Sequence, residues 1–405
     1  MKILWVNNLF LHPANKGGQI RTLEMLKCLS RRHEVHYVAY DNPRTPEGMA
    51  RAGEYSARAY GCRFRIAPRF SPKFFLEMGR NLASRQPALI DRRRSLEMRR
   101  LLERLVREEK FDRLVCDFLT PSVNIPKLED WVLFQHNVET TIFRRYADTA
   151  GDPLRRWYFR TQSKRLFRYE REVCRKVRHV VAVSEADAET MRREFGVNRV
   201  TAISTGVDLD YYARREQAPA ADLVFIGSMD WLPNIDGMGY FVREILPRIR
   251  RRLPDCSVAV VGRDPVPAVR EMAERDRRIT VTGTVPDVRP YLWGSKVSIV
   301  PLRIGGGTRL KIYESMAAGT PVVSTAIGAE GLAVRPGENI HLADAPEEFA
   351  ERCLGLLASE TERRRIGEAA WRMVSERFSW ETVAREFEAI LERAGTSRSA
   401  GKGSD

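Results

Sequence analysis

The sequence predicts an α/β protein that consists of two doubly wound, parallel-sheet domains. Short apolar runs alternate with amphipathic stretches of helical period, and this alternation is typical of β-α units in a parallel sheet. It occurs in two consecutive series, which indicates two domains rather than one. With 405 residues, the chain is long enough for each domain to bury its own core.

The first series supplies five predicted strands and the helices between them. The apolar runs are rich in Val, Leu and aromatic residues, as expected of strands that are buried on both faces of a sheet. They are at residues 3–6, 34–40, 112–116, 131–134 and 179–183. Amphipathic stretches such as 21–32 and 96–108 are predicted to be helices.

The second series follows a polar stretch with Ala and Pro, residues 211–222, which we expect to be a linker. Helices are expected at 239–252 and 310–318, and a last helical pattern covers 360–394. The predicted strands are at residues 222–227, 256–262, 279–283, 297–301 and 321–325. The expected division is an N-terminal domain at 1–210, the linker at 211–222, a C-terminal domain with closing helices at 223–394, and a disordered tail at 395–405.

The composition excludes several classes of protein. Hydrophobic residues make up 43% and charged residues 30%, which excludes a disordered, collagen-like or coiled-coil chain. No run approaches the roughly 18 apolar residues that span a bilayer, and the N-terminus is predicted to be a strand rather than a signal peptide. The six cysteines are scattered, which favours reduced thiols in the cytoplasm over disulfides or a metal site.

The positive charge is unevenly distributed. The formal net charge is +15, and the whole excess lies in residues 1–205. Such an excess indicates an anionic partner, for example a phospholipid, a lipid-linked phosphate or a nucleic acid.

A glycine-rich loop after one strand of the second series is the most informative motif. The strand ends at Pro301, and Gly305, Gly306 and Gly307 lead into a helix that is expected to begin near Thr308. Glycines let the backbone approach a ligand closely, and the positive end of a helix favours phosphate. The alternative is an ordinary β-loop-α unit with a flexible loop.

Charged residues around this loop fit a nucleotide diphosphate. Arg303, Arg309 and Lys311 supply the positive charge that a diphosphate requires. Glu314 lies nearly two turns into the helix, where its carboxylate could accept two hydrogen bonds from a ribose diol.

A histidine marks a second candidate site in the first series. His136 directly follows the run at 131–134, so it is expected at the carboxyl edge of a parallel sheet, where ligands bind. Its neutral imidazole could hydrogen-bond a hydroxyl group. The alternative is a histidine that only ends the strand. Asn137 and Glu139 share the loop and are weaker candidates, for contact with a second substrate that would accept a transferred group.

These motifs resemble, in order and spacing, the retaining glycosyltransferases of the GT-B fold, specifically the family-4-like group 1 enzymes. The versions HNVE (136–139), GSMDWLPN (227–234) and GGGTRLKIYE (305–314) look closest to sugar transferases associated with exosortase (PEP-CTERM) systems. Further similar segments are the loop at Gly17 and Gly18, VVAVSEADAETM (180–191), ISTGVDLDYY (203–212), LVFIGSMDWLPNIDG (223–237), VVGRDP (260–265) and VTGTVPDVRPYL (281–292).

The resemblance implies two domains that face an interdomain cleft, and a role for each matching residue. His136 would face the donor sugar, Lys311 with Arg309 would neutralise the leaving diphosphate, and Glu314 would bind the ribose. Arg303, the glycine loop and Thr308 would belong to the donor site. The remaining donor-binding residues would be Gly17 and Gly18 at the diphosphate and sugar, Gly227 and Ser228 on the cleft floor, and Gly283 and Val285 along the base pocket.

Two departures from the family pattern concern the donor. The family pairs two carboxylates as Glu-x7-Glu, but Gly306 stands eight residues before Glu314, so the first carboxylate is absent. The Arg…Lys pair that many members carry after the first strand of the C-terminal domain is also absent, since Ser228–Asn234 occupy that place. The first departure leaves the identity of the sugar open, and the second assigns the neutralisation of the diphosphate to Lys311 and its arginine neighbours.

The expected function is transfer of a sugar from a nucleotide-diphosphate sugar to a polysaccharide or lipid-linked saccharide acceptor. The resemblance implies retention of configuration, no obligatory metal or other cofactor, and a role in exopolysaccharide biosynthesis. The alternatives are a nucleotide-sugar epimerase or hydrolase on the same fold, and a noncatalytic relative of the transferases. The absent first carboxylate is the main support for the noncatalytic alternative.

A basic stretch at 144–179 predicts where the N-terminal domain meets its anionic partner. Arg160, Lys164, Arg168 and Arg171 recur at helical spacing, with aromatic residues between them. Such a segment can lie on an anionic membrane, which favours a cytoplasmic protein peripheral to the inner face of the plasma membrane and a polyprenyl-linked acceptor. The alternative is a solvated helical face. Nucleic acid is not expected as a partner, because no recognition motif accompanies the charge.

Overall fold

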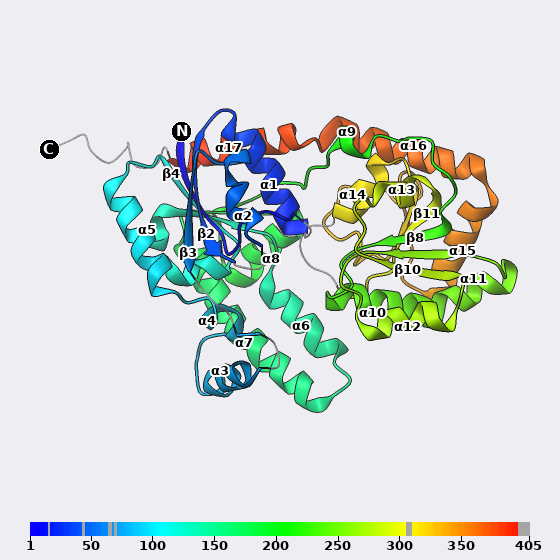
Figure 1. Cartoon of the computed structure of the whole chain (residues 1–405), viewed down its shortest axis with the longest axis horizontal. Helices are drawn as coiled ribbons and strands as arrows, with labels where there is room; N and C mark the ends of the chain where they lie inside the picture. The colour runs from blue at the N-terminus through cyan, green and yellow to red at the C-terminus, as the bar shows by residue number, and fades with distance from the viewer. Residues whose placement is uncertain (15–16, 43–44, 64–66, 69–70, 305–309, 396–405) are drawn as a thin grey trace. The chain divides into compact units, whose positions relative to one another are not determined.

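The computed structural model describes residues 1–14, 17–42, 45–63, 67–68, 71–304 and 310–395. The chain forms two compact units, and each contains a parallel sheet and helices (Figure 1). The first unit comprises Met1–Ser204 and the chain from Val383 onward, and the second comprises the described residues from Thr205 to Thr382. The predicted fold class of two parallel-sheet α/β domains is therefore confirmed.

The first unit is built on a seven-stranded sheet in the order β3-β2-β1-β4-β5-β6-β7, in which all neighbouring pairs are parallel. The strand order reverses between β1 and β4, so the loops that follow these two strands diverge at the carboxyl edge. The edge strands β3 and β7 were not expected from the sequence, because neither forms a continuous apolar run. The strands are β1 (Lys2–Val6), β2 (Glu34–Asp41), β3 (Arg58–Arg63), β4 (Arg113–Asp117), β5 (Trp131–Gln135), β6 (His179–Ala182) and β7 (Val200–Ala202).

The helices of the first unit begin at polar caps where the sequence supplies them. The side chains of Ser95, Asp152 and Ser184 accept hydrogen bonds from main-chain N–H groups of the first turns of α5, α7 and α8. The helices are α1 (Gly17–Ser30), α2 (Glu47–Ala50), α3 (Pro72–Leu82), α4 (Ala88–Asp91), α5 (Leu96–Glu108), α6 (Glu139–Thr149), α7 (Pro153–Lys176) and α8 (Glu185–Phe195), with 3-10 turns η1 (Ala52–Glu54), η2 (Thr120–Asn124) and η3 (Leu128–Asp130).

The C-terminal helix differs from the expected division of the chain. The pattern at 360–394 is two helices, α16 (Glu360–Arg377) and α17 (Trp380–Gly395), and most of α17 belongs to the first unit. The reason is apolar packing, because the ring of Phe387 lies 5.5 Å from that of Trp5 and 5.1 Å from that of Phe134. His33 Nε2 also lies 2.8 Å from Glu388 Oε1, which adds to this contact.

The second unit is built on a six-stranded parallel sheet in the order β10-β9-β8-β11-β12-β13. Its order reverses between β8 and β11. The two-residue strand β13 is too short to be recognised in the sequence. The strands are β8 (Ala221–Ile226), β9 (Val258–Val261), β10 (Ile279–Gly283), β11 (Ser295–Val300), β12 (Val322–Ser324) and β13 (His341–Leu342).

The helices of the second unit follow the prediction with two shifts. The helix expected at 239–252 begins at Leu232, where Pro233 suits a first helical turn, and it contains the π turn η4. The stretch expected to be a linker contains the end of α9 and the start of β8. The elements are α9 (Leu209–Tyr212), α10 (Leu232–Tyr240), η4 (Phe241–Ile245), α11 (Leu246–Arg252), α12 (Pro267–Arg275), α13 (Arg289–Trp293), α14 (Leu310–Ala317) and α15 (Pro346–Ala358), followed by α16.

We expect Gly262→Ala to destabilise the second unit. A methyl group at Gly262, just after β9, would overlap the carbonyl oxygen of Gly227, which is main chain and cannot move aside. Overpacking of this kind costs about 1–3 kcal/mol, which urea denaturation would measure. Gly355→Ala on α15 is the matched control, because a methyl group there meets no described atom within 4 Å. Equal stability of the two variants would contradict the packing described here.

Candidate functional site

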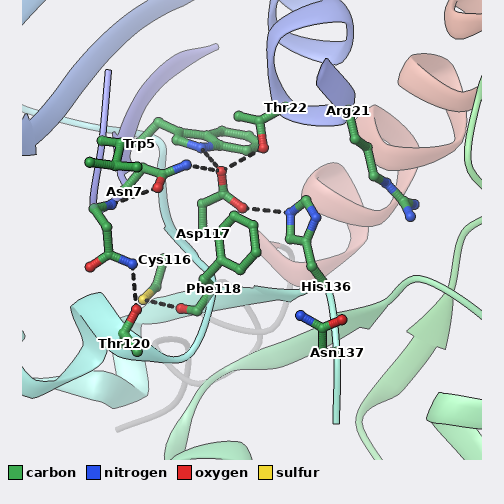
Figure 2. A network of polar contacts seen from close by, with 12 residues as sticks. Trp5, Asn7, Arg21, Thr22, Cys116, Asp117, Phe118, Thr120, His136 and Asn137 are labelled. Atoms are coloured by element: carbon green, nitrogen blue, oxygen red, sulfur yellow. Dashed lines mark hydrogen bonds and ion pairs between the residues drawn. The ribbon is translucent and has the colours of Figure 1, made fainter. Parts of the chain in front are cut away.

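A buried carboxylate lies at the point where the strand order of the first sheet reverses (Figure 2). Asp117 is the last residue of β4, and its side chain is fully buried. Its Oδ2 accepts hydrogen bonds from Trp5 Nε1 at 3.0 Å, Asn7 Nδ2 at 2.6 Å and Thr22 Oγ1 at 2.8 Å. The three donors come from β1, the loop after it and α1, so Asp117 ties this edge of the sheet together.

His136 follows β5 and completes this network. Its Nε2 lies 2.8 Å from Asp117 Oδ1, and the side chain is only 2% exposed. Burial lowers the pKa of His136, so the ring is neutral at pH 7 although Asp117 acts in the opposite direction. Asp117 accepts hydrogen bonds from its three other partners, and we assign it the same accepting role toward His136, which places the proton on Nε2 and leaves Nδ1 as an acceptor. Nδ1 is buried, and it has no hydrogen-bond partner among the described residues.

The ring of His136 is held between aromatic groups and the start of α1. Phe118 stacks on it, with ring centroids 4.0 Å apart and planes at 13°. Phe118 has a φ of +70°, a left-handed conformation that a bulky residue adopts only where its surroundings enforce it. A methyl group at Gly18 would lie 2.6 Å from Phe118 Cζ and 3.6 Å from His136 Nδ1, so only glycine fits there. The structure thus brings together Gly18 and His136, two of the predicted site residues, and Gly17 begins the same helix.

Asn137 and Glu139, the other predicted residues of this loop, are close to His136 in sequence but contact each other. Asn137 Nδ2 donates to Glu139 Oε1 at 3.3 Å. Burial, and then the charge of Glu170, raise the pKa of Glu139 to about 7. Glu139 is the first residue of α6.

A lysine lies at the corresponding position of the second sheet, where β8 and β11 are neighbours. Lys311, in the first described turn of α14, donates from Nζ to Asn234 Oδ1 at 2.7 Å, and Nζ lies 4.3 Å from the ring centroid of Phe225. A methyl group at Gly227 would lie 2.9 Å from Lys311 Nζ and 2.7 Å from Asn234 Nδ2. The glycine that follows β8 therefore gives Lys311 room at the carboxyl edge of the sheet.

Glu314 lies one turn after Lys311 on the same helix face. Its side chain is 9% exposed. Burial raises the pKa of Glu314, while hydrogen bonding with Tyr212 and the charge of Lys311 act in the opposite direction. The structure therefore places the predicted Lys311 and Glu314 together at one edge, with a cation and a carboxylate one turn apart.

The remaining predicted donor-binding residues have varied surroundings. Arg303 forms a two-point ion pair with Asp236, with Nε–Oδ2 at 3.0 Å and Nη2–Oδ1 at 2.5 Å. Ser228 donates to Asp230 Oδ1 at 2.7 Å. Gly283 has a φ of +68°, which favours glycine, and Val285 packs partly buried against the core of the unit. Gly305, Gly306, Gly307, Thr308 and Arg309 lie outside the described residues.

Two side chains at these edges were missed by the sequence analysis. Asp117 directly follows the predicted strand at 112–116, so it is expected at the carboxyl edge of the sheet for the same reason as His136. Asn234 lies in a motif that was identified, GSMDWLPN, but its amide gives no signal of its own. Each contacts a predicted residue, since Asp117 pairs with His136 and Asn234 with Lys311.

Two family models match the chain, one on each half. The model described as "Glycosyltransferase Family 4" matches residues 15–211, and the model described as "Glycosyl transferases group 1" matches residues 220–359. Together they cover most of the residues of both units. The chain therefore belongs to the group 1, family-4-like glycosyltransferases.

Curated relatives are similar over part of their length. An MMP α-(1→4)-mannosyltransferase of Mycolicibacterium hassiacum is 29% identical over 253 residues, which are 60% of this chain and 59% of that protein. A phosphatidyl-myo-inositol mannosyltransferase of Mycobacterium tuberculosis is 27% identical over 231 residues, or 54% of this chain and 60% of that protein. The match thus spans about three fifths of the length of these relatives.

Solved structures share the fold over almost the whole chain. A sucrose-phosphate synthase of Thermosynechococcus elongatus has a TM-score of 0.71 at 15% identity and covers 98% of this chain and 100% of its own. Alr3699/HepE of Anabaena, solved in complex with UDP and glucose, has a TM-score of 0.68 at 14% identity. The match covers 97% of this chain and 100% of the HepE chain. These likenesses confirm the GT-B fold.

Proposed function

We propose that the protein transfers a sugar from a nucleotide-diphosphate sugar to a saccharide acceptor with retention of configuration. The observation that carries the proposal is the pairing of Lys311 and Glu314 at the edge where the second sheet reverses its strand order. Ligands of open α/β sheets bind at such a reversal. The names of the relatives, two mannosyltransferases, and the UDP and glucose in the HepE complex support the same class of reaction.

The second unit supplies the chemistry of the leaving group. When the sugar C1–O bond breaks, the nucleotide diphosphate leaves with its electron pair, and the ammonium of Lys311 stabilises the charge that develops on it. The oxygen of the acceptor hydroxyl forms the new bond to C1, and its proton passes to the leaving diphosphate. Glu314 accepts hydrogen bonds from the ribose hydroxyls, which orients the nucleotide. Lys311 is held toward the edge by Asn234 and Phe225, so its charge is placed before the donor arrives.

The first unit supplies a neutral hydrogen-bonding group. His136, fixed by Asp117, presents Nδ1 as an acceptor at the start of α1. In this role it binds a sugar hydroxyl rather than transferring a proton, because its pKa is lowered by burial. No metal and no further cofactor enter the proposal, and the nucleotide sugar is a substrate.

The first unit also has a basic and apolar surface that fits a lipid-linked acceptor. Arg160, Lys164, Arg168 and Arg171 of α7 are exposed, and none of the four has an ion pair with a described residue. Helix α3 lies beside α7, since Arg165 donates to the main-chain oxygens of Asn81 and Leu82 (Figure 1). The two helices expose Phe75, Leu76, Leu82, Leu154 and Trp157.

We propose that this surface lies on the cytoplasmic face of an anionic membrane that carries a polyprenyl-linked acceptor. We further propose that the protein acts in exopolysaccharide biosynthesis, in a system associated with an exosortase. Apolar side chains insert at the level of the headgroups while cations contact the phosphates. None of the described helices is both long enough and apolar enough to cross a bilayer.

A double variant tests the membrane contact. Arg160→Glu with Lys164→Glu should weaken binding to vesicles of anionic phospholipid more than tenfold, because each basic residue near such a surface contributes about 1 kcal/mol. Co-sedimentation with anionic and with zwitterionic vesicles measures the effect. The matched control is Arg275→Glu with Arg352→Glu, two exposed arginines of the second unit. If both double variants bind anionic vesicles as the parent protein does, α7 is only a solvated face.

The reaction itself is tested by nucleotide release. Purified protein is incubated with UDP-, GDP- and ADP-sugars, with and without a polyprenyl-diphosphate-linked sugar extract. Release that requires the extract supports a transferase and names its donor. Turnover without the extract would favour an epimerase or hydrolase, and neither binding nor turnover with any donor would favour a noncatalytic relative.

A further inference from the structure

A second buried carboxylate of the first unit holds the loop that carries His136. Glu170 lies in the C-terminal third of α7 and is fully buried. Its Oε1 accepts from Gln135 Nε2 and from the main-chain N–H of Glu139, both at 2.8 Å. Its Oε2 accepts from the main-chain N–H of Thr140 at 2.9 Å and from Thr140 Oγ1 at 2.6 Å.

The donors lie on both sides of His136 in the chain. Gln135 directly precedes His136 at the end of β5, and Glu139 and Thr140 follow the loop as the first turn of α6. One carboxylate therefore fixes both ends of residues 136–138. It also fills the N-terminus of α6, where Val138 gives no side-chain cap.

Keeping the buried carboxyl group of Glu170 ionised costs free energy. Burial raises the pKa of Glu170 to about 7, against the four hydrogen bonds, which favour the ionised form. Glu139 beside it is also raised to about 7, so two carboxyl groups share one buried region. A serine or aspartate cap on α6 itself would satisfy the helix end more simply. The burial of Glu170 is therefore better explained by a need to fix the position of residues 136–138 than by a need to stabilise α6.

We infer that Glu170 is a positioning residue that sets His136 from helix α7, so that the basic helix and the sugar-binding histidine form one rigid assembly. The role of His136 in this inference rests on the proposed function. The hold of Glu170 on the loop does not, because it is a matter of hydrogen bonds that can be measured without substrate.

The test uses Glu170→Gln in the full chain, with Glu172→Gln as the matched control on the exposed face of the same helix, where Glu172 pairs with Lys176. A glutamine keeps the shape but turns an NH2 group toward two of the four donors. We expect the amides of Glu139 or Thr140 to exchange hydrogen about tenfold faster, the 15N signals of the His136 ring to shift, and kcat/KM to fall about tenfold. The control should change none of these. Thr140→Val, which removes a single donor, gives a milder version if Glu170→Gln does not fold.

The outcomes separate the inference from the proposed function. Unchanged exchange in Glu170→Gln and in Thr140→Val would overturn the hold on the loop. Faster exchange with unchanged His136 signals would overturn the positioning role. If the parent protein transfers no sugar at all, the proposed function fails, while the exchange and the His136 signals still decide whether Glu170 sets this loop.

Discussion

Lys311→Ala should lower kcat for sugar transfer by about 100-fold or more while leaving the fold intact. A preorganised group that stabilises charge developing in the transition state is worth about 10²–10³ in kcat. Lys311 fits that description because Asn234 and Phe225 already hold its ammonium at the carboxyl edge of β8 and β11. Steady-state kinetics with the donor identified by nucleotide release gives the ratio.

The matched control for this variant is Lys296→Ala. Lys296 lies at the amino end of β11, the strand that precedes α14, where it is half exposed and pairs with Asp222 at 2.8 Å. It should keep kcat within about twofold, since a surface ion pair contributes at most about 1 kcal/mol to stability and lies away from the edge where ligands bind. Equal losses in both variants would mean that Lys311 acts through stability and not through the leaving group.

Asp117→Asn should lower kcat/KM by about 10–100-fold, by reversing the hydrogen-bonding character of His136. An asparagine NH2 facing Nε2 forces the proton of the neutral ring onto Nδ1, so the acceptor that we assign to a sugar hydroxyl becomes a donor. The 15N shifts of the labelled imidazole report the tautomer directly. Because burial lowers the pKa of His136 from 6.5, the ring stays neutral and the loss should persist as the pH is lowered to 6.5.

Asp117→Ala is the wrong variant for this question, because it leaves the buried donors of Trp5, Asn7 and Thr22 without a partner. Each such group costs about 1–3 kcal/mol. Asp112→Asn is the matched control, since Asp112 accepts a hydrogen bond from the main chain of Lys2 at the opposite, amino edge of the sheet. A changed tautomer with unchanged kcat/KM would show that His136 takes no part in sugar binding.

The sequence was sufficient to predict the elements that carry strong local signals. Strands buried on both faces appear as continuous apolar runs, so ten of them could be placed. The strands β3, β7 and β13 could not, because an edge strand or a two-residue strand needs no such run. The helical pattern of 360–394 was visible, but nothing in a period of 3.6 says that Phe387 packs beside Trp5 rather than in the second unit.

The same distinction applies to the candidate site. His136 and Lys311 could be selected because each follows a strand that the sequence reveals. Asp117 also follows such a strand, but its contacts with Trp5 and Asn7 depend on β4 lying beside β1. No local sequence pattern predicts the order of strands in a sheet. Glu170 was hidden for a related reason, since a glutamate among the arginines of α7 resembles a surface residue until the helix is packed.

The most direct test of this account is to measure sugar transfer itself. The purified protein is incubated with its donor and the polyprenyl-linked extract, the acceptor is analysed by mass spectrometry, and the new linkage is assigned by NMR. We expect the acceptor to gain one sugar residue with the anomeric configuration of the donor, and to gain none with Lys311→Ala over the same time. An acceptor that gains nothing while nucleotide is released, or a product of inverted configuration, would contradict the proposed retaining transfer.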